Sequence, residues 1–334
     1  MPVQNKSDFA IEMIDVKKHY TQRQQGTGGL KGLFHPEYKD IPALDGVSFA
    51  LRPGEIAAYA GPNGAGKSTT FKLLCGMLTP DAGEVHALGL DPLKSRIPLM
   101  RRTGVLFGGR NELWWDQPVS MSFEWKRAVW DIDGATYARM MDMAVKELEI
   151  EPILGTFARE LSLGQRMRAE LALMMLHDPE LILLDEPTLG LDVLSKQRMI
   201  AMLRRINEQR GATILVTSHD MDDLQQLARR VIMINKGKLA FDGEFKALSD
   251  QSGLPRRITV TADVQPDVPG ARLIRRDGNR CEFEIDLRQT DMRGVMYALS
   301  QCEGVTDIES GRAPIEDVIA RLYQSWRGGK EEAS

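Results

Sequence analysis

The fold is decided by a glycine-rich stretch that reads Gly61-Pro62-Asn63-Gly64-Ala65-Gly66-Lys67-Ser68-Thr69. It matches the pattern GxxxxGK[ST] and lies between the apolar run 56–60 and a helix that we expect from Lys67. The glycines let the backbone wrap closely, so that successive N–H groups and the helix N-terminus point at phosphate oxygens. Lys67 would then bridge the β- and γ-phosphates of ATP, and the Ser68 hydroxyl would ligate Mg²⁺.

A pair of adjacent acids follows an apolar run further along the chain. Residues 181–184 have the pattern of a buried strand, which ends in Asp185 and Glu186. Open α/β sheets bind ligands at the carboxyl ends of their strands. Asp185 would hold Mg²⁺ through water, and Glu186 would orient and deprotonate the water that attacks the γ-phosphate. The alternative is that the two acids are solvated and cap the next helix.

Strands and helices alternate around these two motifs, which predicts an α/β fold with a mostly parallel sheet. Residues 21–42 interrupt this pattern, because glycines and prolines surround a short apolar group there, and they indicate an inserted loop with one helical turn. The expected strands are 9–16 (an edge strand), 47–51, 56–60, 181–184, 213–217 and 231–235, and the expected helices begin at 67, 119 and 134 or cover 162–176, 194–209 and the residues up to 229.

The chain is predicted to contain two domains. Residues 1–250 form the first, in which about 110–165 have the character of a helical subdomain. Residues 251–334 form a small α+β domain with a polar tail. Its expected strands are 257–262, 271–276 and 280–287, with a hairpin turn at 277–279, and its expected helices are 292–302 and 315–326.

The composition excludes several other classes of protein. Lys and Arg number 43 and Asp and Glu number 47, so the net charge of −4 provides no basic field that would attract nucleic acid. The most apolar stretch, 171–184, is interrupted by charged residues, and none is long enough to cross a bilayer. The three cysteines lie too far apart for a disulfide framework or a CxxC zinc site. We therefore expect a cytosolic protein that binds no nucleic acid.

A third motif, Leu161-Ser162-Leu163-Gly164-Gln165, opens a helix that Ser162 is placed to cap. The phosphate loop, this motif, the strand ending at 185–186, and then Asp192 and His219 follow one another in an order and spacing that resembles an ATP-binding-cassette ATPase. The resemblance covers about residues 9–245. It implies a phosphate-loop nucleotide-binding domain with a mostly parallel core sheet, an antiparallel edge sheet and a helical subdomain.

The resemblance also implies roles for the remaining motif residues. Two nucleotide-binding domains pair head to tail in that family, so Ser162, Leu163, Gly164 and Gln165 would contact the ATP that is bound to the partner copy. Leu163 stands where a glycine is commoner. Asp192 would lie in the loop that crosses the dimer. His219 would donate to the γ-phosphate and position Glu186.

Two positions remain open by sequence. An aromatic ring should stack on adenine. Tyr20 ends the first expected strand, as the stacking residue of that family usually does, and Tyr38 lies five residues before Ala43, at the expected spacing to the following strand; we favour Tyr20. The family's glutamine after the strand near 104–107 is missing, since the chain continues Gly108-Gly109-Arg110-Asn111. Either Asn111 or water substitutes for it, or hydrolysis is slow and its coupling to transport is altered.

Four of the five tryptophans lie within residues 114–130. Aromatic side chains concentrate at the centres of protein interfaces, and in cassette exporters this region receives a short helix of the membrane subunit. Trp114 and Trp115 are therefore predicted to dock that subunit. The alternative is a packed core, because Met121, Trp125 and Val129 repeat at helical spacing.

The resemblance finally implies a function. The chain is similar to ATPase subunits of small-molecule exporters, viologen exporters among them, so we expect an ATP-hydrolysing homodimer at the cytoplasmic face of the inner membrane. Integral membrane permease subunits would be its partners, and the C-terminal domain is similar to regulatory or dimer-supporting tails. The alternatives are a polysaccharide or lipid-linked glycan exporter ATPase, and a soluble cassette ATPase that acts on ribosomes or DNA.

Overall fold

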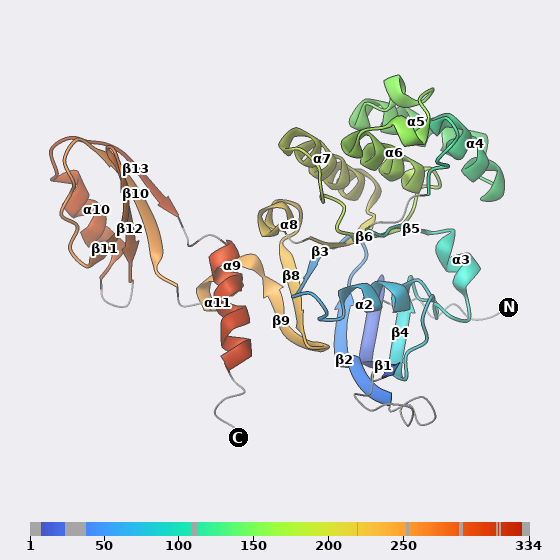
Figure 1. Ribbon diagram of the computed structural model, residues 1–334, viewed down its shortest axis with the longest axis horizontal. Coiled ribbons are helices and arrows are strands. Elements are labelled where there is room, and N and C mark those ends of the chain that lie inside the picture. Colours follow the sequence, from blue (N-terminus) through green and yellow to red (C-terminus); the bar gives the residue numbers. More distant parts are fainter. Residues whose placement is uncertain are drawn as a thin grey trace, which may run out of the picture. The chain divides into compact units, whose positions relative to one another are not determined.

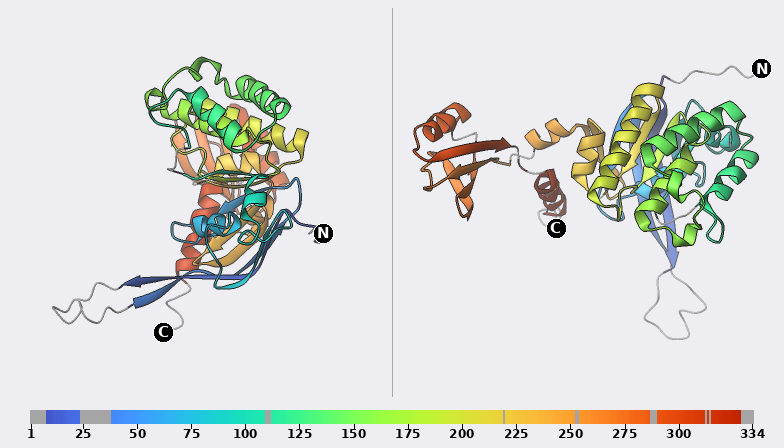
Figure 2. Two further views of the ribbon diagram at one scale, coloured as in Figure 1. Left: turned by 90° about the vertical axis from the view of Figure 1, so that its right-hand side faces the viewer. Right: turned by 90° about the horizontal axis from the view of Figure 1, so that it is seen from above.

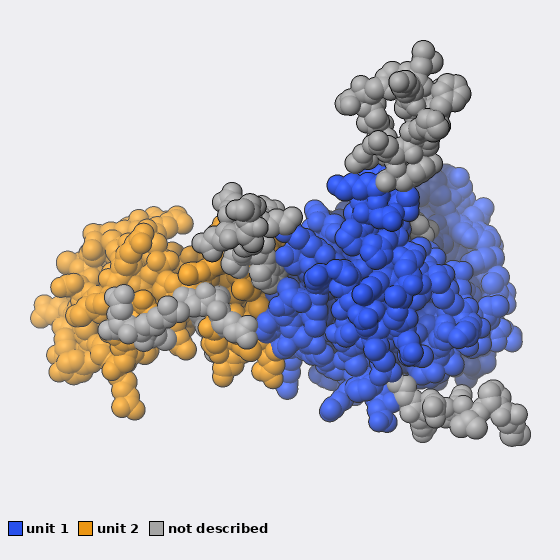
Figure 3. All heavy atoms as spheres, turned by 90° about the horizontal axis from the view of Figure 1, so that it is seen from below, with its two compact units in different colours: residues 1–243 blue, residues 244–334 orange. Residues whose placement is uncertain are grey.

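The structure is a computed structural model that describes residues 8–23, 38–108, 112–218, 220–251, 254–286, 290–311, 313 and 315–328. The chain divides into two compact units, 1–243 and 244–334 (Figure 3). This division precedes the predicted boundary at residue 250. It does so because helix α9 (Phe245–Gln251) contacts the last helix of the chain, α11 (Ile315–Gly328), and so belongs to the second unit.

The first unit is built on a sheet of six strands, in the order β5-β6-β7-β3-β8-β9. The pairs β5·β6, β6·β7, β3·β7 and β3·β8 are parallel, as the alternation of strands and helices predicts. Strand β7 is buried along its whole length, which explains its continuous apolar sequence. The strands are β3 (Ile56–Ala60), β5 (Thr103–Leu106), β6 (Leu181–Asp185), β7 (Thr213–Thr217), β8 (Arg230–Asn235) and β9 (Lys238–Glu244).

A second, antiparallel sheet has the order β2-β1-β4. Its central strand is β1 (Ile11–Arg23), which pairs with β2 (Tyr38–Leu51) on one side and β4 (Ala82–Ala87) on the other. The strand predicted at 9–16 is therefore present from Ile11, but its predicted place at the edge of a sheet is wrong. The inserted loop is also shorter than predicted, because pairing continues to Arg23 and Tyr38 in a long hairpin that Figure 2 shows projecting from the sheet.

Helix α2 (Lys67–Leu74) contributes buried side chains to a hydrophobic core that also contains residues of both sheets. Its Phe71 and Leu74 are fully buried beside Tyr59 of β3 and Leu183 of β6. The Tyr59 hydroxyl shares a hydrogen bond of 2.9 Å with Thr70, so the one polar atom of this ring has a partner. The core therefore fixes the start of α2 at the carboxyl end of β3.

In the first unit, α4, α5, α6 and α7 lie together on one side of the six-stranded sheet, whereas α2 lies on the other (Figure 1). Helix α5 begins where Asp133 accepts hydrogen bonds from the N–H groups of Ala135 and Thr136, so the predicted start is confirmed. The helices here are α3 (Arg96–Met100), α4 (Val119–Val129), α5 (Gly134–Leu148) and α6 (Leu163–Met175), with the short turns Glu151–Ile153 and Ala158–Glu160; α7 (Val193–Arg210) and α8 (Met221–Leu227) follow.

The second unit is an antiparallel sheet in the order β11-β12-β10-β13, with α10 (Met292–Ser300) packed on its apolar face through Val295 and Leu299. Three of its strands match the predicted ones: β10 (Arg256–Ala262), β11 (Ala271–Asp277) and β12 (Arg280–Ile285). The fourth, β13 (Val305–Gly311), is absent from the sequence interpretation, because only Val305 and Ile308 of this acidic strand pack against the core. In the part of the chain that the structure describes, no helix has both the length and the apolarity to cross a membrane.

Candidate ATP site

The glycine-rich loop joins β3 to α2 with a backbone that a larger residue would not adopt. Gly66 caps α2 at a φ of 113°, and a Cβ there would lie 2.5 Å from the Ala43 carbonyl oxygen. Gly64 also has a positive φ, 77°, but no neighbour within 4 Å of a Cβ. Gly66 is therefore required by close packing, and Gly64 by its left-handed backbone.

The Lys67 ammonium group is held against the carbonyls of the same loop. Its Nζ donates to the Gly61 oxygen at 2.6 Å and to the Pro62 oxygen at 3.3 Å. Burial lowers the pKa of Lys67, and the carboxylates of Glu186 and Asp185 oppose that shift. A positive charge therefore stands in the loop that is shaped for phosphate.

Asp185 is fixed by hydroxyl groups from two other elements. The Ser68 Oγ of α2 donates to its Oδ2 at 3.1 Å, and the Thr217 Oγ1 of β7 donates to its Oδ1 at 2.7 Å. A hydroxyl and a carboxylate are oxygen ligands that Mg²⁺ accepts, and this ion takes one or two protein ligands beside phosphates and water. Ser68 and Asp185 therefore fit an Mg²⁺ ion that is bound partly by substrate. Among the described residues, no group of three or more His, Cys, Asp or Glu side chains could hold a metal.

Glu186 follows Asp185 in a backbone conformation that is rare for its residue type. Its φ is 57°, and non-glycine residues in this region cost about 1 to 3 kcal/mol. The Glu186 N–H donates to Thr217, to the carbonyl oxygen at 3.2 Å and to Oγ1 at 3.0 Å. Thr217 therefore holds the Asp185 carboxylate and the Glu186 backbone, a role that the sequence interpretation missed.

The two tyrosine candidates differ in their distance from the loop. The Tyr20 hydroxyl lies 3.5 Å from Thr69 Oγ1, at the end of the phosphate loop. Tyr38 pairs with Arg23, three positions further along the hairpin than the pair of Tyr20 with Ile41. Because strand residues rise by about 3.3 Å each, the Tyr38 backbone is roughly 10 Å further out. The side chain of Tyr38 lies outside the described residues.

The motif 161–165 and Asp192 lie side by side in a second cluster. Ser162 and Gln165 form a capping box, in which the Gln165 N–H donates to Ser162 Oγ at 3.2 Å and the Ser162 N–H donates to Gln165 Oε1 at 2.9 Å. A Cβ on Gly164 would lie 3.8 Å from Asp192 Oδ2, and Leu163 is exposed. Asp192 caps α7 by accepting from the Ser195 N–H at 2.9 Å.

His219 and residues 109–111, which include Asn111, lie outside the described residues. The residues on either side of His219 are anchored. Ser218 Oγ lies 3.2 Å from Thr188 Oγ1, and Asp220 pairs with Lys196 at 2.5 Å. Ser218 is thus tied to the loop after Glu186, and Asp220 to α7.

The aromatic residues after β5 form an exposed surface, so the packed-core interpretation of this region is wrong. Helix α4 buries Val119 and Phe123, while its other side turns outward. The rings of Trp114 and Trp125 lie 5.3 Å apart, and the exposed fraction of Trp115 is 50%. We call this the aromatic surface; its members are Trp114, Trp115, Met121, Trp125 and Val129, all exposed.

A cavity of about 330 Å³ borders α4 and β5. Lys126 and Glu112 form an ion pair of 2.9 Å at its wall, and His177 stacks on Trp130 with 4.6 Å between ring centroids. His177 Nε2 bonds to the Thr103 carbonyl oxygen at 3.1 Å. Burial, with help from the Lys126 charge, lowers the pKa of His177 to about 4.

This pKa predicts an acid-sensitive contribution to stability. The ordinary value is 6.5, so between pH 6.5 and 4 the unfolded chain binds a proton at His177 that the folded chain does not. The wild type is therefore expected to lose about 3 kcal/mol of unfolding free energy over that interval relative to His177→Gln, whose amide still donates to Thr103. Urea denaturation at several pH values measures this difference. Parallel pH profiles for the two chains would contradict it.

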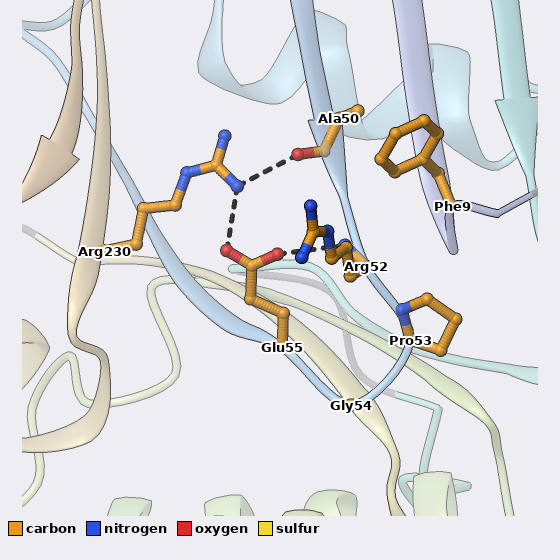
Figure 4. Close-up of a pocket in the computed structure, with 7 residues that line it drawn as sticks. All are labelled: Phe9, Ala50, Arg52, Pro53, Gly54, Glu55 and Arg230. Carbon is orange, nitrogen blue, oxygen red and sulfur yellow. Dashed lines mark hydrogen bonds and ion pairs between the residues drawn. The ribbon is translucent and has the colours of Figure 1, made fainter.

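A second pocket, of about 510 Å³, lies at the Arg52-Pro53-Gly54-Glu55 turn (Figure 4). Arg230 fills its polar wall, with 2.8 Å to Glu55, 3.0 Å to the Ala50 carbonyl oxygen and 2.6 Å to Asp242. These polar groups satisfy one another, so nothing here points to a ligand.

The fold and the site together define a nucleoside triphosphatase with a phosphate-binding loop. Comparison with known proteins identifies the family within this class. The family model described as ABC transporter matches residues 44–189. The chain is 30% identical to the energy-coupling factor transporter ATP-binding protein EcfA of Methanoculleus marisnigri, over 73% of this chain and 87% of that protein. The chain therefore belongs to the ATP-binding subunits of ABC transporters, which bind ATP with Mg²⁺ and hydrolyse it.

Two further comparisons bear on the fold and on the extent of the match. The chain is 32% identical to the probable multidrug ABC transporter ATP-binding protein YbhF of Escherichia coli, over 69% of this chain but only 38% of that protein. A dimeric post-hydrolysis structure of the cassette MJ0796 with ADP and Pi has a TM-score of 0.58 at 23% identity and covers 70% of this chain and 98% of that one. The cassette fold is thereby established for the first unit.

Proposed function

We propose that the chain hydrolyses ATP to drive export of a small molecule through separate membrane subunits. The observation that carries the proposal is the convergence of Lys67, Ser68 and the acids 185–186 at the ends of β3 and β6. The name of YbhF, a probable multidrug transporter protein, supports export, while the name of EcfA belongs to another kind of transporter. The direction of transport and the class of the transported substrate are therefore part of this proposal.

The described residues divide the chemistry among them. The loop N–H groups and Lys67 bind the phosphates, and Lys67 exchanges its carbonyl partners for phosphate oxygens. Ser68 and Asp185 hold Mg²⁺, which neutralises charge on the transferring phosphoryl group. Glu186, whose backbone N–H bonds to Thr217, accepts the proton of the attacking water, and His219 follows strand β7 in the sequence. Tyr20 stacks on adenine, because its hydroxyl already reaches Thr69.

We propose that two copies complete each ATP site. Ser162–Gln165 present a capped helix N-terminus, which favours an anion, and the exposed Leu163 adjoins it. Apolar side chains around Asp192 are also exposed, Leu189 at 63% and Val193 at 72%. A head-to-tail partner would cover them, and the MJ0796 cassette, whose fold is similar, is dimeric in its solved structure. The pair is a homodimer in this proposal. The second unit has a regulatory or dimer-supporting role in it.

The aromatic surface and its neighbouring cavity are the proposed docking site of the membrane subunits. Interface centres are rich in tryptophan. The exposed Trp114 and Trp115 closely follow Glu112, which lines the cavity together with Lys126. Docking there would place the chain at the cytoplasmic face of the membrane. A glycan exporter is less well supported, because the second unit has one four-stranded sheet among its described residues and not a two-sheet sandwich.

The docking proposal is tested with tagged protein and detergent-solubilised native membranes. Wild type is expected to retain a multi-span membrane protein, identified by mass spectrometry, whereas Trp114→Ala with Trp115→Ala retains at least about tenfold less, since central tryptophans contribute 2 kcal/mol or more each. Tyr297→Ala, an exposed aromatic of the second unit, is the matched control and should bind as wild type does. Capture of ribosomal proteins in place of a membrane protein would show that the cassette powers another process.

A further inference from the structure

Helix α6, which begins at the motif 161–165, carries one buried acid in an apolar run. Glu170 is 3% exposed and is followed by Leu171, Leu173 and Met174, all buried. Burial raises the pKa of this carboxyl, and backbone hydrogen bonds oppose that shift. A carboxylate is costly to bury unless it is well bonded, so its partners indicate why it is there.

Those partners are backbone N–H groups of the segment that leads to the aromatic surface. The Glu112 N–H donates to Oε1 at 3.0 Å and to Oε2 at 3.1 Å, and the Leu113 N–H donates to Oε1 at 3.1 Å. Hydrogen bonds to an ionised acceptor are roughly twice as strong as neutral ones. Glu170 therefore fastens residues 112–113 to the middle of α6.

A second residue of the same helix face holds the next part of this segment. Arg166 lies four residues before Glu170, so the two side chains leave α6 on one side. The Arg166 guanidinium stands 4.6 Å from the Trp115 ring centroid. Arg166 directly follows Gln165, the last residue of the motif. The segment 112–115 is thus attached at two points to the first half of α6.

We propose that Glu170 and Arg166 are positioning residues that couple the aromatic surface to the motif 161–165. A membrane subunit that shifts residues 112–115 would move the start of α6, and ATP bound between two copies would in turn shift residues 112–115. The inference rests on the proposed function, which assigns the membrane subunit to the aromatic surface and the ATP of the partner copy to the motif 161–165. The link between the ends is a property of this chain alone.

Amide hydrogen exchange of the purified full chain tests the link, with Mg-ATP as the probe. In a Glu186→Gln background, which keeps ATP unhydrolysed, Mg-ATP is expected to change the exchange of peptide 112–117. Adding Glu170→Ala should speed exchange at Glu112 and Leu113 at least about tenfold without nucleotide, because their acceptor is lost. It should also abolish the response of peptide 112–117 to Mg-ATP, while peptides of the phosphate loop still respond.

Two further variants keep the test sharp if Glu170→Ala unfolds. Arg166→Ala removes only the contact to Trp115 and should reduce the response of peptide 112–117, and Glu170→Gln, which retains one carbonyl acceptor, should give an intermediate response. Glu147→Ala is the matched control: Glu147 is a partly buried acid of the neighbouring α5 that pairs with Arg205. It should leave peptide 112–117 as in the parent chain.

Size-exclusion chromatography separates failure of this inference from failure of the proposed function. If Mg-ATP dimerises the parent chain but peptide 112–117 does not respond, the link is wrong. An equal response in the Glu170→Ala and parent chains would also overturn it. If the parent chain does not dimerise, the head-to-tail proposal is wrong; the link within one chain is then still tested by the exchange of Glu112 and Leu113 without nucleotide, which Glu170→Ala should speed.

Discussion

Glu186→Gln is expected to lower the ATP turnover number by a factor of about 10² to 10⁴ while ATP still binds. That is the range that a positioned general base contributes. The amide fills the same volume and cannot accept the proton of the attacking water. The Glu186 backbone N–H still donates to Thr217, so the rare backbone conformation and the neighbouring Asp185 remain in place. Steady-state phosphate release and binding of a fluorescent ATP analogue measure the two quantities.

Glu180→Gln is the matched control for this prediction. Glu180 precedes β6, at the opposite end of the strand from Glu186, and its carboxylate pairs with Arg102 at 2.6 Å. Its loss should leave turnover within a factor of two and affect stability only slightly, because exposed ion pairs contribute about 1 kcal/mol or less. Rapid hydrolysis by Glu186→Gln would remove Glu186 from the role of base.

The fold was most predictable where burial imposes a pattern on the sequence. Strands β6 and β7 are covered on both faces, so each appears in the sequence as an apolar run. The predicted ends of these strands nearly coincide with the observed ones. The hairpin arms were missed for the opposite reason. Thr21, Gln22, Lys39 and Asp40 are all exposed, so neither face of the ladder carries an apolar period. Backbone pairing across the hairpin, rather than side-chain burial, determines that part of the structure.

The site was predictable where a chemical motif is contiguous, as in the loop 61–69. Thr217 and Glu170 were missed because they act through partners far away in sequence, on Asp185 and on residues 112–113. A signal was present for Glu170, since it is a lone acid in the apolar stretch 169–175. No such signal marks Thr217, whose role depends on β6 and β7 being neighbours in the sheet.

In the proposed dimer, the chain contributes two half-sites that are held by different contacts. The half-site of Lys67, Ser68 and Asp185 is assembled within the core, from three strands and α2. The half-site of Ser162–Gln165 begins a helix whose other contacts reach toward the aromatic surface. The half-site in the core is therefore suited to bind ATP. The half-site at the start of α6 is suited to respond when a partner binds the aromatic surface.

Lys67→Ala is expected to weaken ATP binding roughly 100-fold, or about 3 kcal/mol, because one charged group that bonds phosphate contributes up to that amount. The change leaves the Gly61 carbonyl without its 2.6 Å partner but removes a charge that is only 7% exposed, so the loop should remain folded. Lys72→Ala, on the same helix, is the matched control and should bind normally. Fluorescent-nucleotide titration with and without Mg²⁺ measures the affinity. Undiminished binding by Lys67→Ala would mean that the phosphates lie elsewhere.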